Sequence, residues 1–220
     1  MIAQSTLPAL DRRHLLLGAT TLVFLAGCGG GNLLGPGPDP QLYMLKPTFG
    51  PVDGPTVSWA LNIAAPTSAD SLNTSRIALF NPPARLDYYA NAAWPDQLPS
   101  LVQSTLVQAF EQSGKIASVA SDEAGLRSDY MLQTEIRDFN AVYDTPDTAP
   151  KVKVRIMVKL VQTHARDIVQ TLEVEQEVAA GANSVDNVVI AAGQALTAAL
   201  RQIVEWALKA PPLPQPPSGS

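Results

Sequence analysis

The clearest chemistry in this chain belongs to Leu25, Ala26, Gly27 and Cys28. Ala26 and Gly27 are small, so the backbone before Cys28 suits a narrow peptidase groove, and the sulfur of Cys28 can accept a lipid. This L-A-G-C arrangement is typical of a bacterial lipobox, in which a peptidase cuts between Gly27 and Cys28. The thiol then carries a diacylglycerol, and the new amino terminus is usually acylated. The alternative is a free thiol in an ordinary leader.

The residues before Cys28 have the layout of a secretory leader. Arg12 and Arg13 form a basic segment, and the run from Leu15 to Ala26 is nearly all apolar but too short to span a bilayer. We therefore predict that residues 1–27 are a lipoprotein signal peptide. The paired arginines only partly match a twin-arginine signal, so both the general secretory route and the twin-arginine route stay open.

Composition limits the class of protein that follows the leader. Removal of residues 1–27 leaves 193 residues with a net charge of −6, which suits one folded domain and argues against nucleic acid as a partner. Cys28 is the single cysteine, so disulfides and thiolate metal clusters are excluded. The fold must depend on its hydrophobic core.

Proline and glycine mark the limits of that domain. Residues 28–40 are rich in both and predict a flexible tether, and residues 210–220 predict a proline-rich extended tail. The folded domain is expected over residues 41–209.

Within the domain, the apolar spacing alternates between strand and helix. A period near 3.6 predicts one helix from about Pro95 to Gly114 and another from Ser184 to Trp206. The predicted strands are Gln41–Lys46, Val57–Ala64, Arg76–Phe80, Leu86–Tyr89, Ile116–Ala120, Tyr130–Ile136, Val152–Leu160 and Leu172–Val178. We expect an α/β fold of the α+β kind: a two-layer sandwich with an antiparallel or mixed sheet and both helices on one face.

Two of these strands carry opposite charges and predict their own register. Lys153 and Arg155 lie on one strand, and Glu175 and Glu177 lie on the next, all at odd positions. In an antiparallel hairpin, the numbers of two directly opposed residues have a constant sum. These charges share a face when that sum is even, and a sum near 330 pairs Arg155 with Glu175 and Lys153 with Glu177. A loop of three or five residues gives this register, whereas a loop of two or four residues needs a bulge. The charged face is either a docking surface or a solvated sheet face.

Nothing in the sequence has the pattern of a catalytic or metal site. His164 is predicted in an exposed turn, and no nucleophile, phosphate-loop or metalloprotease motif occurs. Asp122, Glu123 and Asp129 bracket a loop, but their spacing matches no known calcium loop. Tyr88, Tyr89 and Trp94 are the remaining candidates, either as an apolar ledge for a lipid or partner helix or as cover for the junction between helix and sheet.

Four segments resemble one known family. They are L-D-Y-Y-A-N-A-A-W-P-D-Q-L-P from Leu86 to Pro99, F-E-Q-S-G ending at Gly114, D-Y-M-L-Q-T-E-I-R-D-F-N-A-V-Y from Asp129 to Tyr143, and the closing helix with Trp206. From about Tyr43 to Leu208 the chain is similar to the ABC-type transport auxiliary lipoproteins, which include the lipoprotein of the paraquat-inducible (Pqi) membrane-integrity system.

The resemblance implies a non-enzymatic periplasmic domain held by its lipid on the inner leaflet of the outer membrane. Its implied partners are an Mce-domain protein and an ABC transporter or Pqi-type inner-membrane protein, with a homo-oligomeric ring as an open alternative. Gly29 fits outer-membrane sorting, because inner-membrane retention signals often place aspartate there. Rival functions are a periplasmic lipid-binding carrier and a structural lipoprotein for envelope assembly.

Overall fold

The computed structural model describes residues 39–145 and 147–211. The predicted signal peptide, the cleavage site at Gly27 and Cys28, nearly all of the tether and residues 212–220 of the tail lie outside the described residues.

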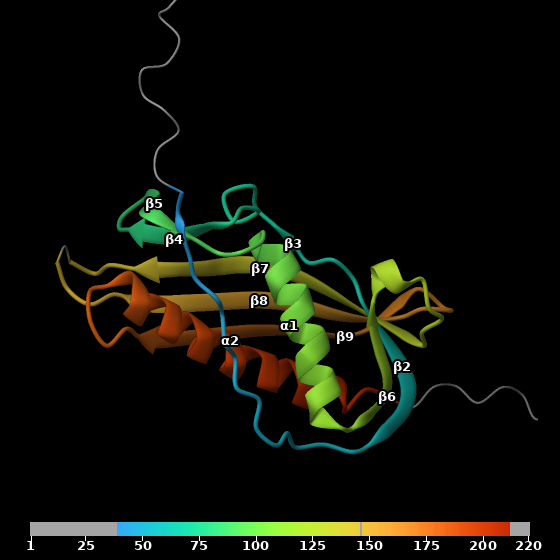
Figure 1. The fold of residues 1–220 in the computed structure, drawn as a ribbon. Coiled ribbons are helices and arrows are strands. Elements are labelled where there is room, and N and C mark those ends of the chain that lie inside the picture. Colours follow the sequence, from blue (N-terminus) through green and yellow to red (C-terminus); the bar gives the residue numbers. More distant parts are fainter. Residues whose placement is uncertain (1–38, 146, 212–220) are drawn as a thin grey trace, which may run out of the picture. The chain divides into compact units, whose positions relative to one another are not determined.

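The described residues form one mixed sheet and two α-helices (Figure 1). The α-helices are α1 (Leu98–Ser113) and α2 (Val185–Ala207), and a short 3-10 helix covers Asp122–Ala124. The strands are β1 (Gln41–Leu42), β2 (Val57–Ile63), β3 (Thr67–Ser68), β4 (Arg76–Asn81), β5 (Arg85–Ala93), β6 (Ile116–Ser121), β7 (Tyr130–Val142), β8 (Lys151–Gln162) and β9 (Asp167–Ala179).

Strand β7 is the centre of the sheet. One of its edges pairs with β8 along its whole length in an antiparallel ladder. Its other edge pairs in parallel with β2, β3 and β4 in turn, at Leu61, Thr67 and Leu79 respectively. β6 extends the sheet beyond β2, while β5 and β1 extend it beyond β4. The sheet does not close, and β9 pairs only with β8, so β9 forms a long free edge.

The β8–β9 hairpin has the predicted register. Arg155 lies opposite Glu175, and Lys153 lies opposite Glu177. The connecting loop, residues 163–166, has four residues, and the register shifts between Leu160 and Val161. A loop with four residues needs a bulge if the charges of both strands are to share a face. The bulge between Leu160 and Val161 meets this requirement.

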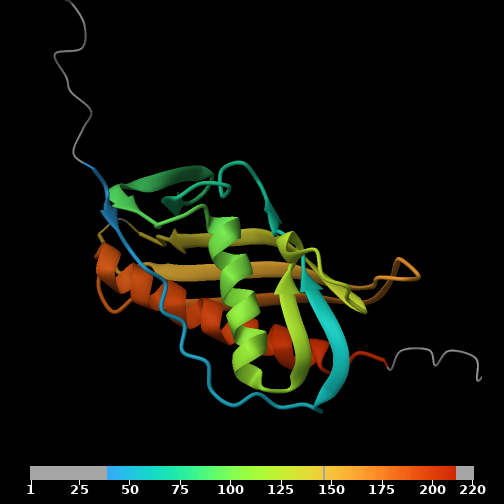
Figure 2. The same ribbon diagram turned by 45° about the vertical axis from the view of Figure 1, so that its right-hand side comes forward.

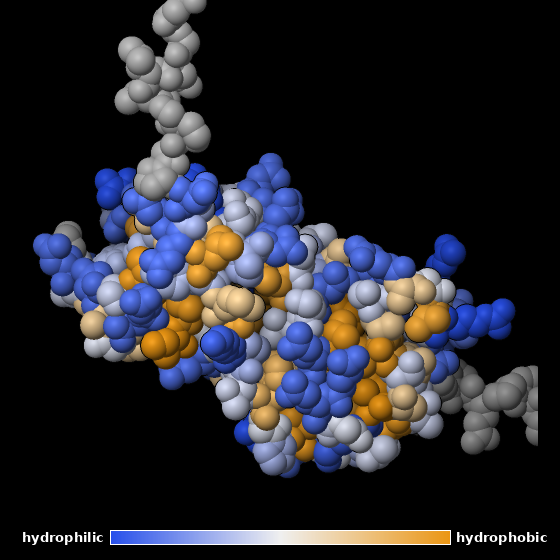
Figure 3. Space-filling model, in the orientation of Figure 1, coloured by the Kyte–Doolittle hydropathy of each residue, from blue (hydrophilic) through white to orange (hydrophobic). Residues whose placement is uncertain are grey.

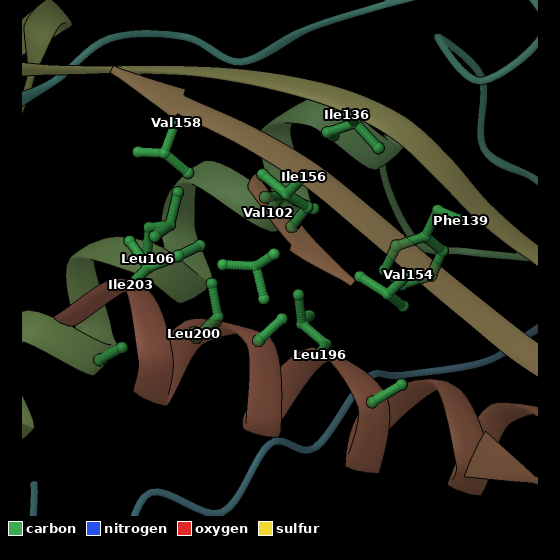
Figure 4. Packing of buried hydrophobic residues seen from close by; sticks show 14 of the residues in the cluster. Val102, Leu106, Ile136, Phe139, Val154, Ile156, Val158, Leu196, Leu200 and Ile203 are labelled. Carbon is green, nitrogen blue, oxygen red and sulfur yellow. The ribbon is translucent and has the colours of Figure 1, made fainter. Parts of the chain in front are cut away.

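Both helices cover the same face of the sheet, as the two views show (Figures 1 and 2). Ser184 begins α2, with its hydroxyl accepting a hydrogen bond from the backbone N–H of Asn187, and Gly114 ends α1 in the left-handed conformation. Leu196, Leu200 and Ile203 of α2 are fully buried against β8 and α1 (Figure 4). The small residues Ala192, Ala195 and Ala199 let α2 lie close to the sheet. By length and composition α2 could span a membrane, but here it is the central helix of the core.

The first expected strand is mostly absent. Only Gln41–Leu42 of the predicted Gln41–Lys46 pairs, with Ala92 and Ala93 of β5, and the following residues run as an irregular strap across α2 (Figure 1). Pro47, Pro51 and Pro55 lack the N–H groups that a ladder requires, which favours an irregular course beyond Lys46.

Strand β7 extends beyond the predicted Tyr130–Ile136, because its buried residues change from even to odd positions partway along the strand. Leu132 and Ile136, at even positions, face the helices, but beyond the bulge the odd-numbered Phe139 and Ala141 do so. The shift lies between Ile136 and Asp138, where Arg137 is the extra residue.

Candidate docking surface

The sheet face opposite the helices is the principal candidate for a functional surface. We define the open face as the exposed and half-buried side chains that β7, β8 and β9 direct away from α1 and α2. Within the described residues no helix covers this face. Its members are Gln133, Glu135, Arg137, Asp138, Lys153, Arg155, Met157, Lys159, Glu173, Glu175 and Glu177.

Ion pairs connect the strands across this face, and the three shortest are within 3.0 Å. The guanidinium of Arg155 on β8 donates to Asp138 on β7 over 2.6 Å, and that of Arg137 donates to Glu173 on β9 over 3.0 Å. The ammonium of Lys153 lies 2.9 Å from Glu175, which is diagonal to it rather than directly opposite. The hydrogen bond to Asp138 is the largest cause of a raised pKa at Arg155, so this cation stays charged.

The β7 bulge gives this network its shape. A regular strand would send Arg137 and Asp138 to opposite faces, whereas the bulge lets both reach the open face. Sequence reasoning missed Asp138 as a member of the surface. The change from even to odd buried positions between Ile136 and Phe139 was the signal that could have revealed it.

Two hollows lie along the open face, beside the segment that follows β2. One of about 320 Å³ lies between Ala64, Thr67 and Met157. The other, of about 530 Å³, lies between Leu72, Leu86 and Arg155. The open face is therefore bordered by raised side chains on the side of β3 to β5, whereas its border at β9 is open.

A second surface lies on the helix side, between the strap and α2. It is a groove of about 590 Å³ lined by apolar side chains that include Met44, Val189 and Ile190. Met44 and Ile190 are about 60% exposed, and Lys46 and Arg201 also line the groove. Apolar side chains interrupt the polar surface on this side of the molecule (Figure 3). Sequence reasoning missed this groove because the strap was expected to be a strand.

The aromatic residues singled out in the sequence do not form a ledge. Trp94 is buried, and its ring meets that of Phe139 edge to face at 6.1 Å. The Tyr88 hydroxyl donates to the carbonyl of Ser71, and the Arg76 guanidinium stacks over the Tyr88 ring. These contacts give Trp94 and Tyr88 internal roles.

Tyr89 is also held by a hydrogen bond within the domain. Its hydroxyl shares a hydrogen bond of 2.8 Å with that of Tyr143, which in turn donates to Asn183. Burial, with the Tyr143 hydroxyl as a smaller cause, raises the pKa of Tyr89 above its ordinary range. The hydroxyl therefore stays protonated and joins β5 to the end of β7.

Asp122 and Asp129, two of the acidic residues around the loop, form hydrogen bonds within the fold. One carboxylate oxygen of Asp122 accepts from the Gln103 amide and the other from the backbone N–H of Ala65. Asp129 accepts from the backbone N–H of Ala60 over 2.8 Å. Among residues 39–145 and 147–211, no cluster of histidine, cysteine and carboxylate side chains could hold a metal ion. His164 lies in the exposed β8–β9 turn, as predicted.

Two proteins of known structure share the fold of this chain, and one further protein is similar to part of its sequence. The protein XCC0632 from Xanthomonas campestris has a crystal structure that is 28% identical, with a TM-score of 0.71 over 76% of this chain and 95% of that one. Another crystal structure, of an uncharacterised protein, is 16% identical with a TM-score of 0.58 over 73% of this chain and 98% of that one, and shows the fold alone. An uncharacterised protein of Bradyrhizobium diazoefficiens is 29% identical over 53% of this chain, which spans only 31% of that relative's length.

The family assignment covers most of the described sheet and both helices. Residues 43–204 match the sequence model of the ABC-type transport auxiliary lipoprotein component, and the matching range begins in the strap and ends in α2. This is a class of transport accessory lipoproteins associated with the cell envelope. The chain belongs to the ABC-type transport auxiliary lipoprotein family.

Proposed function

We propose that this protein is a lipid-anchored auxiliary subunit of an Mce-type lipid transport system, docking that machinery at the periplasmic face of the outer membrane. Its partners in this proposal are an Mce-domain protein and an ABC transporter or Pqi-type protein of the inner membrane. Membership of the transport auxiliary family supports the class of function, and the lipobox at Cys28 supports the anchor.

The observation that carries the docking role is the open face. It spans the three longest strands, is charged, and has no helix over it in the described part of the chain. Side chains fill the space between helices and sheet, where residues such as Val158, Leu106 and Leu196 are fully buried (Figure 4). A surface that binds another protein is thus better supported than an internal chamber that encloses cargo.

An affinity capture from the native envelope tests this proposal. The lipidated full-length chain is cross-linked in cells and recovered, and co-recovered proteins and lipids are measured together by mass spectrometry. We expect an Mce protein with little stoichiometric lipid. Recovery of one lipid per chain and no transport protein would contradict the docking role.

Two charge-reversal variants, measured by the same affinity capture, test which surface of the protein docks. Glu177→Lys alters the open face, and Glu111→Lys makes the same change on the exposed side of α1. We expect Glu177→Lys to lower recovery of the Mce protein about fivefold, equivalent to about 1 kcal/mol. Glu111→Lys is expected to leave recovery unchanged. Equal losses in both variants would contradict docking through the open face.

The groove beside α2 favours a second candidate, a periplasmic lipid carrier. It is apolar along Met44 and Ile190 and cationic at Lys46, which suits one acyl chain with an anionic headgroup. Native mass spectrometry of the wild type and of an Ile190→Asp variant distinguishes the two functions. A carrier would lose a bound phospholipid in the variant, whereas a docking subunit would show none in either protein.

A further inference from the structure

The free edge of β9 is the longest stretch of unpaired strand in the described residues. β9 has 13 residues and pairs only with β8. β1 and β6, the other outermost strands, have two and six residues. A long exposed strand edge offers a row of backbone donors and acceptors to an extended segment of another chain.

The register shows which residues of β9 offer these groups. The N–H of Ala180 donates to the carbonyl of Pro150 over 2.9 Å. In an antiparallel ladder, hydrogen-bonded pairs recur at every second residue, so the even-numbered residues of β9 bond to β8 down to the bulge. Odd-numbered residues therefore direct their N–H and C=O groups towards the free edge. They include Glu173, Glu175 and Glu177.

The same residues place a column of carboxylates along that edge. The Glu173, Glu175 and Glu177 side chains lie on the open face and are exposed. Behind them, β8 carries Lys153, Arg155 and Lys159 on this face. The charge on the open face therefore changes from basic on β8 to acidic on β9, and a following strand would continue this alternation if its charges were basic.

We propose that the free edge of β9 binds an extended segment of a partner protein in which Lys or Arg alternates with apolar β-branched residues. Residues bonded to Glu173, Glu175 and Glu177 would place their side chains on the open face, opposite the carboxylates. The intervening residues would lie beside Leu172, Val174 and Val178, on the side of the helices. β8 itself has this pattern, in Lys151-Val152-Lys153-Val154-Arg155, and it occupies the inner edge of β9.

Two other occupants fit the edge less well. A second copy pairing β9 with β9 in antiparallel fashion would set the glutamates against one another, because their positions are all odd, and like charges opposite one another are destabilising. The C-terminal tail has prolines at 211, 212, 214, 216 and 217, and proline cannot donate to a ladder.

A peptide test separates backbone pairing from charge attraction. The probe is an acetylated and amidated nonapeptide of alternating lysine and valine, added to the full-length lipidated protein in nonionic detergent. Its control has glutamate at each lysine position. We expect only the basic peptide to bind, with new protection from hydrogen exchange at the amides of Glu173, Glu175 and Glu177. The even-numbered amides of β9 are already bonded to β8 and should change little.

Two substitutions at one position sharpen the test. The Glu175 N–H points away from β8, so Glu175→Pro removes an edge donor without removing a bond to β8, while Glu175→Ala removes the carboxylate and keeps the donor. We expect Glu175→Pro to weaken peptide binding at least about tenfold and Glu175→Ala about threefold. The alanine variant should also be less sensitive to salt than the wild type.

Three results would overturn the proposal. They are no binding of the basic peptide, binding that leaves the odd-numbered amides unprotected, and a dimer in which these amides are protected without peptide, which would assign the edge to a second copy. The partner's identity rests on the proposed docking function, but the peptide test needs no transport protein. Its failure would therefore leave the envelope capture result standing, and failure of that capture would leave the peptide result standing.

Discussion

At the scale of single residues, Gly114 isolates the cost of a left-handed backbone. It ends α1 at φ 63°, and a Cβ placed there would meet nothing within 4 Å. Gly114→Ala should therefore lower the free energy of unfolding by about 1–2 kcal/mol through backbone strain alone. Chemical denaturation with urea measures the loss.

Two other glycines serve as a matched comparison. Gly50 also has open space around a Cβ and has no left-handed φ, so Gly50→Ala should change stability by less than about 0.5 kcal/mol. Gly54 has φ 140°, and its Cβ would lie 3.2 Å from that of Leu208, so Gly54→Ala should cost more than Gly114→Ala. Equal costs at Gly50 and Gly114 would show that backbone strain is not the cause.

Glu205 predicts a pH dependence of stability. Its carboxylate accepts from the Arg201 guanidinium at 2.9 Å and from the backbone N–H of Asp53 at 3.2 Å, which holds the strap to α2. The hydrogen bond from Arg201 is the largest cause of a lowered pKa at Glu205. A depressed folded pKa adds stability above the unfolded value, near 4.5, and this is lost as pH falls through the folded pKa.

Glu205→Gln tests this linkage. The variant should be less stable than the wild type at about pH 7, and the two should converge once the pH falls below the lowered folded pKa, where the carboxylate is protonated in both states. Thermal unfolding at several pH values measures the difference. A gap that does not change with pH would assign the effect to packing and not to ionisation.

At the scale of elements, alternation predicted which way each strand faces but not which strand lies beside it. The β8–β9 register followed from the odd positions of Arg155 and Glu175, since charged residues mark one face of that hairpin and apolar residues mark the other. The parallel pairing of β2 with β7 joins Leu61 to Tyr130, and no local signal encodes such a distant contact. Apart from Asp138 beyond the β7 bulge, the open face could thus be predicted strand by strand, while the strap, the order of the strands and the aromatic contacts depend on tertiary packing.

The ion pair between Arg155 and Asp138 predicts a measurable coupling between β7 and β8. Their side chains are 36% and 26% exposed, and Arg155 also lies 3.7 Å from Glu173. A double-mutant cycle with Arg155→Met and Asp138→Asn should give a coupling of about 0.5–1 kcal/mol that falls in high salt.

The pair between Arg85 and Asp87 provides the comparison. It is similarly short, at 2.7 Å, but its side chains are 73% and 44% exposed. The same cycle there should give a coupling below about 0.3 kcal/mol. A coupling at this exposed pair as large as that at Arg155 would contradict the view that the open face is a cooperative network.

At the scale of the whole molecule, the proposed function assigns location to the predicted anchor and recognition to the described domain. The lipid at Cys28 would fix the protein to a membrane, since each buried methylene contributes roughly 0.8 kcal/mol and several chains hold far more firmly than one. A tether from Cys28 to Gln41 reaches at most about 40 Å at ~3.3 Å per residue. That reach is enough to lift the open face and the β9 edge clear of the headgroups.

Removing the lipid should therefore change location without changing the fold. Because cleavage before Cys28 depends on the lipobox, Cys28→Ala alone could leave the leader attached, so an ordinary cleavable leader should replace residues 1–27 in this variant. We expect it to fractionate as a soluble periplasmic protein with an unchanged unfolding midpoint, while Asn32→Ala, in the tether behind an intact lipobox, stays with the membrane. A Cys28→Ala protein that remained membrane-bound would place the anchor elsewhere, and its release by added Met44→Asp and Ile190→Asp changes would identify the groove beside α2 as that anchor.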